Sequence, residues 1–223
     1  MARRTYTERR WPDTPEFNSV LRGLKAGGST RLLGFVWKAY DRFCIEALRD
    51  MDCSLADEDL ERDITEHLVL MISDAMTGYE PFWVQHGPFE RESRLGGSAQ
   101  PPQYDIGFKL RCNPRIMWPL EAKVLRTDGT TAEYIRAVKS NFLTCRYSPF
   151  SSEAAMLGYL LSGAPERALA NIAKKGGWEL VRHEYFRERD HRTSNHKRSV
   201  PQGRPYPAAF RCHHMIFQLK KSY

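Results

Sequence analysis

The spacing of apolar residues changes along this 223-residue chain, and that change limits the folds open to it. Between residues 30 and 76 apolar side chains recur every three or four positions, which is the spacing of amphipathic helices. From Phe82 onwards they come in short segments, several of them alternating with polar residues, and such segments predict strands. Helical and strand segments then alternate, which favours one α/β domain with helices packed around a small mixed sheet.

The expected helices cover 30–50, 57–76, 131–143 and 166–175, and the expected strands cover 82–84, 104–110, 116–125, 154–161 and 214–219. Residues 1–28 are polar and basic, with several prolines and glycines, and we expect a basic N-terminal arm there. Residues 29–223 then form a single domain with a helical N-terminal part, 29–78. Residues 182–204 are polar and basic and predict a long loop. The last strand, 214–219, is expected at the edge of the sheet.

Several classes of protein are disfavoured by simple patterns. No run of about 18 apolar residues occurs, and no apolar segment follows the N-terminal arginines, so we expect a cytoplasmic protein without membrane contact. The five cysteines are scattered and form no CxxC pair, which favours reduced thiols. Cys212-His213-His214 is a dense group of metal-binding residue types. Adjacent histidines in a strand point to opposite faces, however, so no zinc site is predicted there.

Charge is distributed unevenly along the chain. The net charge is +7, and residues 124–223 hold 17 basic and eight acidic side chains. Residues 38–74 hold four basic and eleven acidic side chains instead. A positive excess of this size favours polyanionic partners, and its position favours a contact made by the C-terminal half.

Two apolar strands contain the charged residues Asp105, Glu121 and Lys123, among others. Glu121 and Lys123 are two positions apart and share one face of their strand. If the two strands pair, Asp105 joins them, and neighbouring carboxylates need a cation or a proton between them. Mg²⁺ prefers such oxygen ligands, and a nearby lysine can act on water or neutralise a phosphate. The alternative is a surface aspartate beside an ordinary Glu–Lys ion pair.

Asp105, followed sixteen residues later by Glu121-Ala122-Lys123, resembles the motif of the PD-(D/E)xK nuclease superfamily. This superfamily includes restriction endonucleases, junction resolvases and phage-defence nucleases, and its usual element order, α-β-β-β-α-β, matches residues 57–161. The resemblance implies a restriction-endonuclease-like core and a metal held by Asp105, Glu121 and the backbone carbonyl of Ala122. It also implies a catalytic Lys123. Gln103-Tyr104 stands where a proline often precedes the aspartate.

Many members of this superfamily add a glutamate from the helix before the first strand. The segment Glu61-Arg62-Asp63-Ile64-Thr65 looks like that helix motif, and Glu61 is the glutamate we expect in the site. Glu58 and Glu66 are the alternatives. Glu61 also lies on the same helical stripe as the apolar residues of this segment.

The resemblance and the charge together predict a metal-dependent endonuclease that hydrolyses nucleic acid, DNA rather than RNA, in bacterial or phage defence. The expected cofactor is Mg²⁺, with Mn²⁺ as a substitute, and the expected partners are a second copy of the chain or other subunits of a defence complex. Basic residues of the 182–204 segment are expected to contact the nucleic-acid backbone, namely Arg187, Arg189, Arg192, Lys197 and Arg198. The main alternative is an inactive subunit of the same fold that binds nucleic acid or a protein partner. A third alternative is a purely structural partner in a larger complex, with exposed apolar surface on the 30–50 helix.

Overall fold

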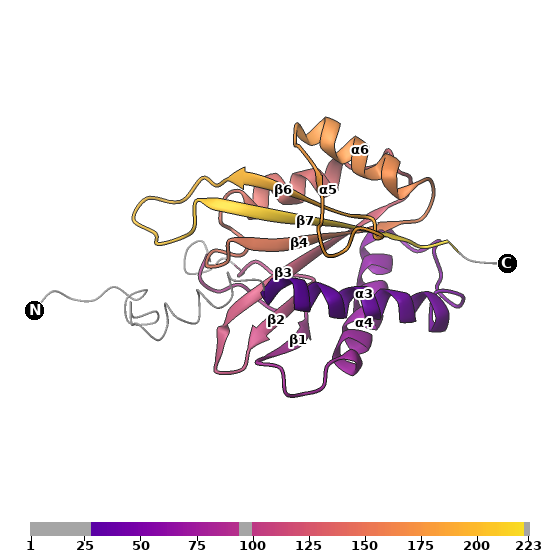
Figure 1. Cartoon of the computed structure of the whole chain (residues 1–223), viewed down its shortest axis with the longest axis horizontal. Coiled ribbons are helices and arrows are strands. Elements are labelled where there is room, and N and C mark those ends of the chain that lie inside the picture. Colours follow the sequence, from indigo (N-terminus) through magenta and orange to yellow (C-terminus); the bar gives the residue numbers. More distant parts are fainter. Residues whose placement is uncertain (1–27, 94–99, 221–223) are drawn as a thin grey trace, which may run out of the picture.

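The computed structural model describes residues 28–93 and 100–220 (Figure 1). The predicted basic arm, 1–28, lies outside the described residues except for its last position. In the described part, helices cover both faces of one sheet (Figure 1). The helices are α3 (Gly28–Glu46), α4 (Asp57–Ala75), α5 (Ala132–Ala137), which continues into the π-helical turn η1 (Val138–Phe142), and α6 (Pro165–Gly176). The protein is therefore of the mixed α/β class.

The sheet has seven strands in the order β1-β2-β3-β4-β7-β6-β5. They are β1 (Phe82–His86), β2 (Ile106–Leu110), β3 (Asn113–Leu125), β4 (Glu153–Leu160), β5 (Val181–Arg182), β6 (His191–Lys197) and β7 (Ala209–Gln218). β1, β2 and β3 form an antiparallel meander, β3, β4 and β7 run parallel, and β7, β6 and β5 are antiparallel. Over residues 57–161 the element order is the predicted α-β-β-β-α-β.

Each face of the sheet has its own hydrophobic core. Helices α3 and α4 pack against alternate residues of the central strands, such as Leu120, Ala122 and Leu157. Helices α5 and α6 pack against the other face, where Met156 and Ile216 are buried. Glu121 pairs with Met156 across β3 and β4, and Lys123 pairs with Gly158, so both charged residues lie on the second face. This alternation is the one expected from the strand period.

Two predictions about the C-terminal part were wrong. The segment 182–204 is not a long loop, because it contains strand β6, which pairs along its length with β7. The last strand, β7, lies between β4 and β6 and is not an edge strand. The physical reason is that β6 has the polar sequence HRTSNHK and still buries His191 and Ser194. A strand that buries polar side chains shows no alternation of apolar and polar residues.

None of the helices in the described part of the chain combines the length and the apolar character of a membrane span. Their apolar residues lie in stripes that face the sheet. On α4 the buried side chains include Leu60, Ile64 and Leu68, and three acidic residues occupy its first turn, where the helix dipole favours them.

Candidate active site

The predicted site lies where strand β2 stops pairing with β3. The β2–β3 register ends at the pair Ile106–Leu120, so the last five residues of β3 pair with β4 alone. Asp105 stands immediately before β2, and its Oδ2 accepts a hydrogen bond of 2.6 Å from the backbone N–H of Ala122. The carboxylate thus satisfies a donor that has no strand partner on that side. This contact fixes Asp105 beside the Glu121-Ala122-Lys123 segment.

Lys123 is the centre of the site. Its Nζ lies 2.7 Å from Oε1 of Glu61, 3.3 Å from Oε1 of Glu121 and 4.0 Å from Oδ2 of Asp105. The structure therefore brings together all four side chains expected from the sequence, from helix α4, the start of β2 and strand β3. Glu121 is 5% exposed, while the other three are only partly buried.

The electrostatics of the cluster are dominated by three carboxylates around one ammonium. Burial, and then the charge of Asp105, raise the pKa of Glu61 to about 7. Burial also raises the pKa of Asp105, and it raises that of Glu121 well above the usual range. Burial opposes the charge of Lys123, but the carboxylates outweigh it and raise the pKa of the lysine. One positive charge cannot neutralise three ionised acids, so the site favours an additional proton or cation.

These residues fit a hard divalent cation. Oε2 of Glu121 is buried and has no hydrogen-bond partner in the structure, which leaves a carboxylate oxygen free in the middle of the cluster. Carboxylate oxygens are the ligands that Mg²⁺ and Mn²⁺ prefer. Asp105 and Glu121 would hold such an ion. The ion and the ammonium of Lys123 would then neutralise the carboxylates together. The use of the Ala122 carbonyl as a third ligand stays a prediction.

A pocket of about 660 Å³ opens beside Glu61 and Lys123. Its wall includes Glu58, which does not reach the lysine, and the other alternative, Glu66, lies instead beside His86, with 3.7 Å between Oε1 and Nδ1. Glu61 is therefore the predicted helix glutamate that the structure places in contact with Lys123. Arg126 also lines this pocket, but its guanidinium is bonded to Asp57 and to two backbone carbonyls.

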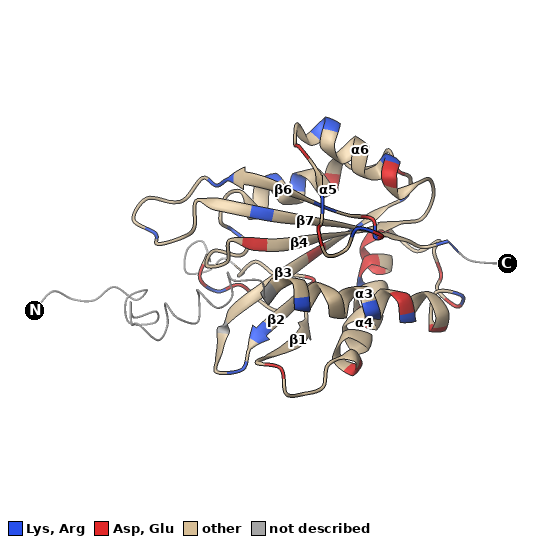
Figure 2. Cartoon of the chain, in the orientation of Figure 1, with Lys and Arg blue, Asp and Glu red and all other residues tan. Residues whose placement is uncertain are grey.

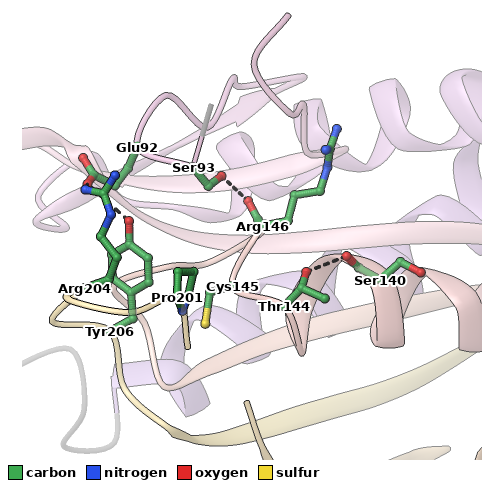
Figure 3. Close-up of a pocket in the computed structure, with 9 residues that line it drawn as sticks. All are labelled: Glu92, Ser93, Ser140, Thr144, Cys145, Arg146, Pro201, Arg204 and Tyr206. Carbon is green, nitrogen blue, oxygen red and sulfur yellow. Dashed lines mark hydrogen bonds and ion pairs between the residues drawn. The ribbon is translucent and has the colours of Figure 1, made fainter. Parts of the chain in front are cut away.

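A second pocket, of about 380 Å³, has Ser93 and Arg146 among its lining residues (Figure 3). In it the hydroxyl of Ser93 donates to the backbone carbonyl of Arg146, as Figure 3 shows. The next residue, Tyr147, donates from its hydroxyl to the carbonyl of Gln103 at 2.7 Å. Burial, and then the charges of Glu121 and Asp105, raise the pKa of Tyr147. Tyr147 thus connects the wall of this pocket to the carboxylates.

The five basic residues predicted to contact nucleic acid do not form one surface. Arg192 and Arg198 are buried: Arg192 pairs with Glu166 at 2.7 Å, and Arg198 donates to the backbone carbonyls of Ser148 and Ser151. Arg189 forms a two-pronged ion pair with Asp41, at 2.6 Å for each contact. These three side chains serve packing and pairing within the protein, which corrects the picture of a free basic loop.

Arg187 and Lys197 are exposed, and their predicted contact with nucleic acid stays a prediction. Strands β4 and β7 separate β6 from β3, so the segment 182–204 does not border the Lys123 cluster through the sheet. Lys and Arg positions are spread over both helical layers and over the strands (Figure 2).

The structure also contains a cluster of ionisable residues that the sequence analysis did not predict. His213 and His214 point to opposite faces of β7, as expected for adjacent strand residues. His214 contacts Tyr134 and Ser194 on one face. On the other face, His213 lies beside His191, with 3.2 Å between their ring nitrogens. The only signal in the sequence was the number of histidines between residues 183 and 214.

Comparison of the chain with protein-family models, with curated proteins and with solved structures gives no match. The functional interpretation therefore depends on the geometry of the site and on the motif.

Proposed function

We propose that this protein is a metal-dependent nuclease of the PD-(D/E)xK type, with Glu61, Asp105, Glu121 and Lys123 as its catalytic site. The observation that supports this most directly is the convergence of three carboxylates on one lysine where β2 begins. The element order over residues 57–161 is consistent with a restriction-endonuclease-like core. Burying three acids around a lysine costs stability, and such a cost is typical of a functional site.

The four residues of the proposed site have separate tasks. Asp105 and Glu121 hold a divalent cation, Mg²⁺ or in its place Mn²⁺. When bound, that ion supplies positive charge against a phosphate and makes a water more acidic. Lys123 places an ammonium where negative charge develops on the phosphate during hydrolysis. Glu61 holds the ammonium in position through its 2.7 Å contact.

The resemblance extends the proposal to the substrate and the setting. We infer DNA in preference to RNA as the substrate, a role in bacterial or phage defence in the cytoplasm, and action as a homodimer or as a subunit of a larger defence complex. Exposed Arg187 and Lys197 are candidates for contact with the phosphate backbone.

A nuclease assay on single- and double-stranded DNA and RNA, with Mg²⁺, Mn²⁺ or EDTA, tests the proposal. We expect cleavage that requires the metal and that falls about 100-fold or more in Glu121→Gln and in Lys123→Ala, because each removes a charge that acts on the reacting phosphate. Glu58→Gln is the matched control, since this acid lines the pocket without contacting Lys123, and it should keep wild-type activity. Full activity of Glu121→Gln or Lys123→Ala would contradict the assignment.

One observation favours a second function, that of an inactive binding subunit of the same fold. Lys123 lies close enough to all three carboxylates to neutralise part of their charge without any metal. A binding subunit would show nucleic-acid binding that weakens with salt, no cleavage under any metal condition, and no change in thermal stability when Mg²⁺ is added.

A further inference from the structure

A histidine cluster lies on the α3 side of the sheet, the face opposite to that of Glu121 and Lys123. His183 follows β5, His191 begins β6 and His213 belongs to β7. In the β6–β7 register Thr193 pairs with His213 and His191 pairs with Met215, so both histidines face the same side. All three are buried, with exposures of 8%, 0% and 1%. Three chain segments thus bring three imidazoles together inside the protein.

The three imidazoles lie close enough together to hold one metal ion. One ring nitrogen from each histidine lies within 4.8 Å of the other two. Nε2 of His191 and Nδ1 of His213 are 3.2 Å apart. Two nitrogens bound to one tetrahedral zinc ion at about 2.0–2.1 Å lie about 3.3 Å from each other.

The chemical state of the cluster also suits a metal. Burial, and then the neighbouring His213, lower the pKa of His183 to about 4, and burial also lowers the pKa of His191 and of His213. The three rings are therefore neutral at neutral pH, which is the form that binds metals.

A carboxylate completes the surroundings of His213. Its Nε2 is buried without a hydrogen-bond partner, and Oε2 of Glu153 lies 3.7 Å away. Histidine ligands commonly direct their second ring nitrogen to a carboxylate, which orients the ring and increases its basicity. Nδ1 of His213 faces the cluster, 3.2 Å from Nε2 of His191.

We propose that His183, His191 and His213 form a binding site for Zn²⁺, which joins strands β6 and β7 and the segment after β5. The site is distinct from the carboxylate cluster in its position and in its chemistry. His213 belongs to the same cross-strand row as Leu120 and Ala155, whereas Glu121 belongs to the next row, so the two clusters lie on opposite faces of the sheet. Imidazole nitrogens favour zinc and similar ions over Mg²⁺.

Zinc binding must change one contact of helix α3. The indole N–H of Trp37 donates to Nδ1 of His191 at 3.3 Å, so the metal-free ring carries its proton on Nε2. The backbone N–H of Tyr185 likewise donates to Nδ1 of His183 at 3.2 Å. When Nε2 binds an ion, the neutral ring carries its proton on Nδ1, and these two donors must move away. Trp37 is therefore a built-in reporter of the site.

Titration of the metal-free protein with Zn²⁺ against a coloured chelator tests the proposal. We expect one zinc ion per chain, an affinity at least tenfold lower in His191→Gln and His213→Asn, and unchanged affinity in the control His67→Gln, which alters a partly exposed histidine on α4. Tryptophan fluorescence should change on zinc addition in the wild type, and the change should be smaller in Trp37→Phe, which keeps Trp118, whose ring centroid lies 6.0 Å from that of His213. Glu121→Gln should bind zinc as the wild type does. Equal zinc affinity in all these variants would overturn the proposal, as would a wild type that binds no zinc.

X-ray absorption at the zinc edge of the loaded wild-type protein gives a test that does not depend on the folding of any variant. Scattering from three imidazole rings supports the site. A first shell made mainly of carboxylate oxygens, or of fewer than two imidazoles, would assign the ion elsewhere and overturn the proposal.

Discussion

Two buried polar clusters lie on opposite faces of one sheet, and they satisfy their buried groups in different ways. Around Lys123, three carboxylates keep raised pKa values and depend on one ammonium. Around His191, three imidazoles lose their charge on burial. His191 forms hydrogen bonds with His213 and Trp37, and His183 accepts one from the backbone N–H of Tyr185. A buried acid needs a counterion or a proton, whereas a buried histidine becomes neutral by itself. The stability of the carboxylate cluster should therefore depend on the charges within it, and that of the histidine cluster on the placement of its rings.

Removal of the ammonium is the strongest test of this difference. Lys123→Met leaves three partly or fully buried carboxylates without their cation, and breaking such a buried pair costs about 3–5 kcal/mol in the free energy of unfolding. Urea denaturation without divalent metal measures the loss. The control is Lys109→Met on β2, because Lys109 is partly buried but bonded to the neutral Gln85. We expect a loss of less than about 1.5 kcal/mol there, since only a neutral partner loses its bond.

Equal losses in the two variants would show that the carboxylates are not held by charge. The Lys123 cluster would then not differ from the histidine cluster, because both would behave as ordinary hydrogen-bonded networks.

Glu90, a buried acid outside the Lys123 cluster, separates the effect of a proton from that of a lysine. Glu90 is 5% exposed and accepts a hydrogen bond of 2.6 Å from the hydroxyl of Tyr104, next to Asp105 in the chain, and a second from the backbone N–H of Glu92. No cation is described beside it, and burial raises its pKa to about 7 from an ordinary value of 4.5. The folded protein therefore holds a proton that the unfolded chain releases.

The sign of the pH effect follows from this. The stabilisation is fully present below pH 4.5 and is lost as the pH rises through 7. Between pH 5 and pH 8 we expect the wild type to lose about 2 kcal/mol of unfolding free energy relative to Glu90→Gln, whose side chain does not titrate. Urea denaturation of both proteins across this range gives the difference. Parallel curves would show that folding does not raise the pKa of Glu90.

The carboxylate site could be predicted because its signals are local. Glu121 and Lys123 are two residues apart in one strand, and Asp105 precedes the neighbouring strand of the same meander. The likeness of the segment that begins at Glu61 to the helix motif of the superfamily, supported by its place on the apolar stripe, favoured Glu61 over Glu58 and Glu66. The order of elements over 57–161 followed from the change in apolar spacing.

The contacts of the polar residues around β6 could not be predicted, because their partners lie far away in the chain. Arg189 pairs with Asp41, 148 positions earlier, and Trp37 bonds to His191, 154 positions later. Strand β6 buries polar residues in place of apolar ones, so its sequence resembles a solvated loop. Charges counted along the chain show how many basic residues a segment has, but they do not show which are already paired.

The basic residues of that segment give the smallest predicted effect. Arg187 is exposed, and Arg187→Ala should weaken nucleic-acid binding a few-fold and reduce the salt dependence of binding by about one phosphate contact. Arg192→Ala removes a buried partner of Glu166 and should lower the free energy of unfolding by about 1–3 kcal/mol, while the salt dependence stays unchanged. Binding isotherms at several salt concentrations, with urea denaturation of both variants, measure the two effects. A change in salt dependence in Arg192→Ala but not in Arg187→Ala would contradict this prediction. It would mean that Arg192 leaves Glu166 to bind phosphate, and that its charge is not neutralised within the protein.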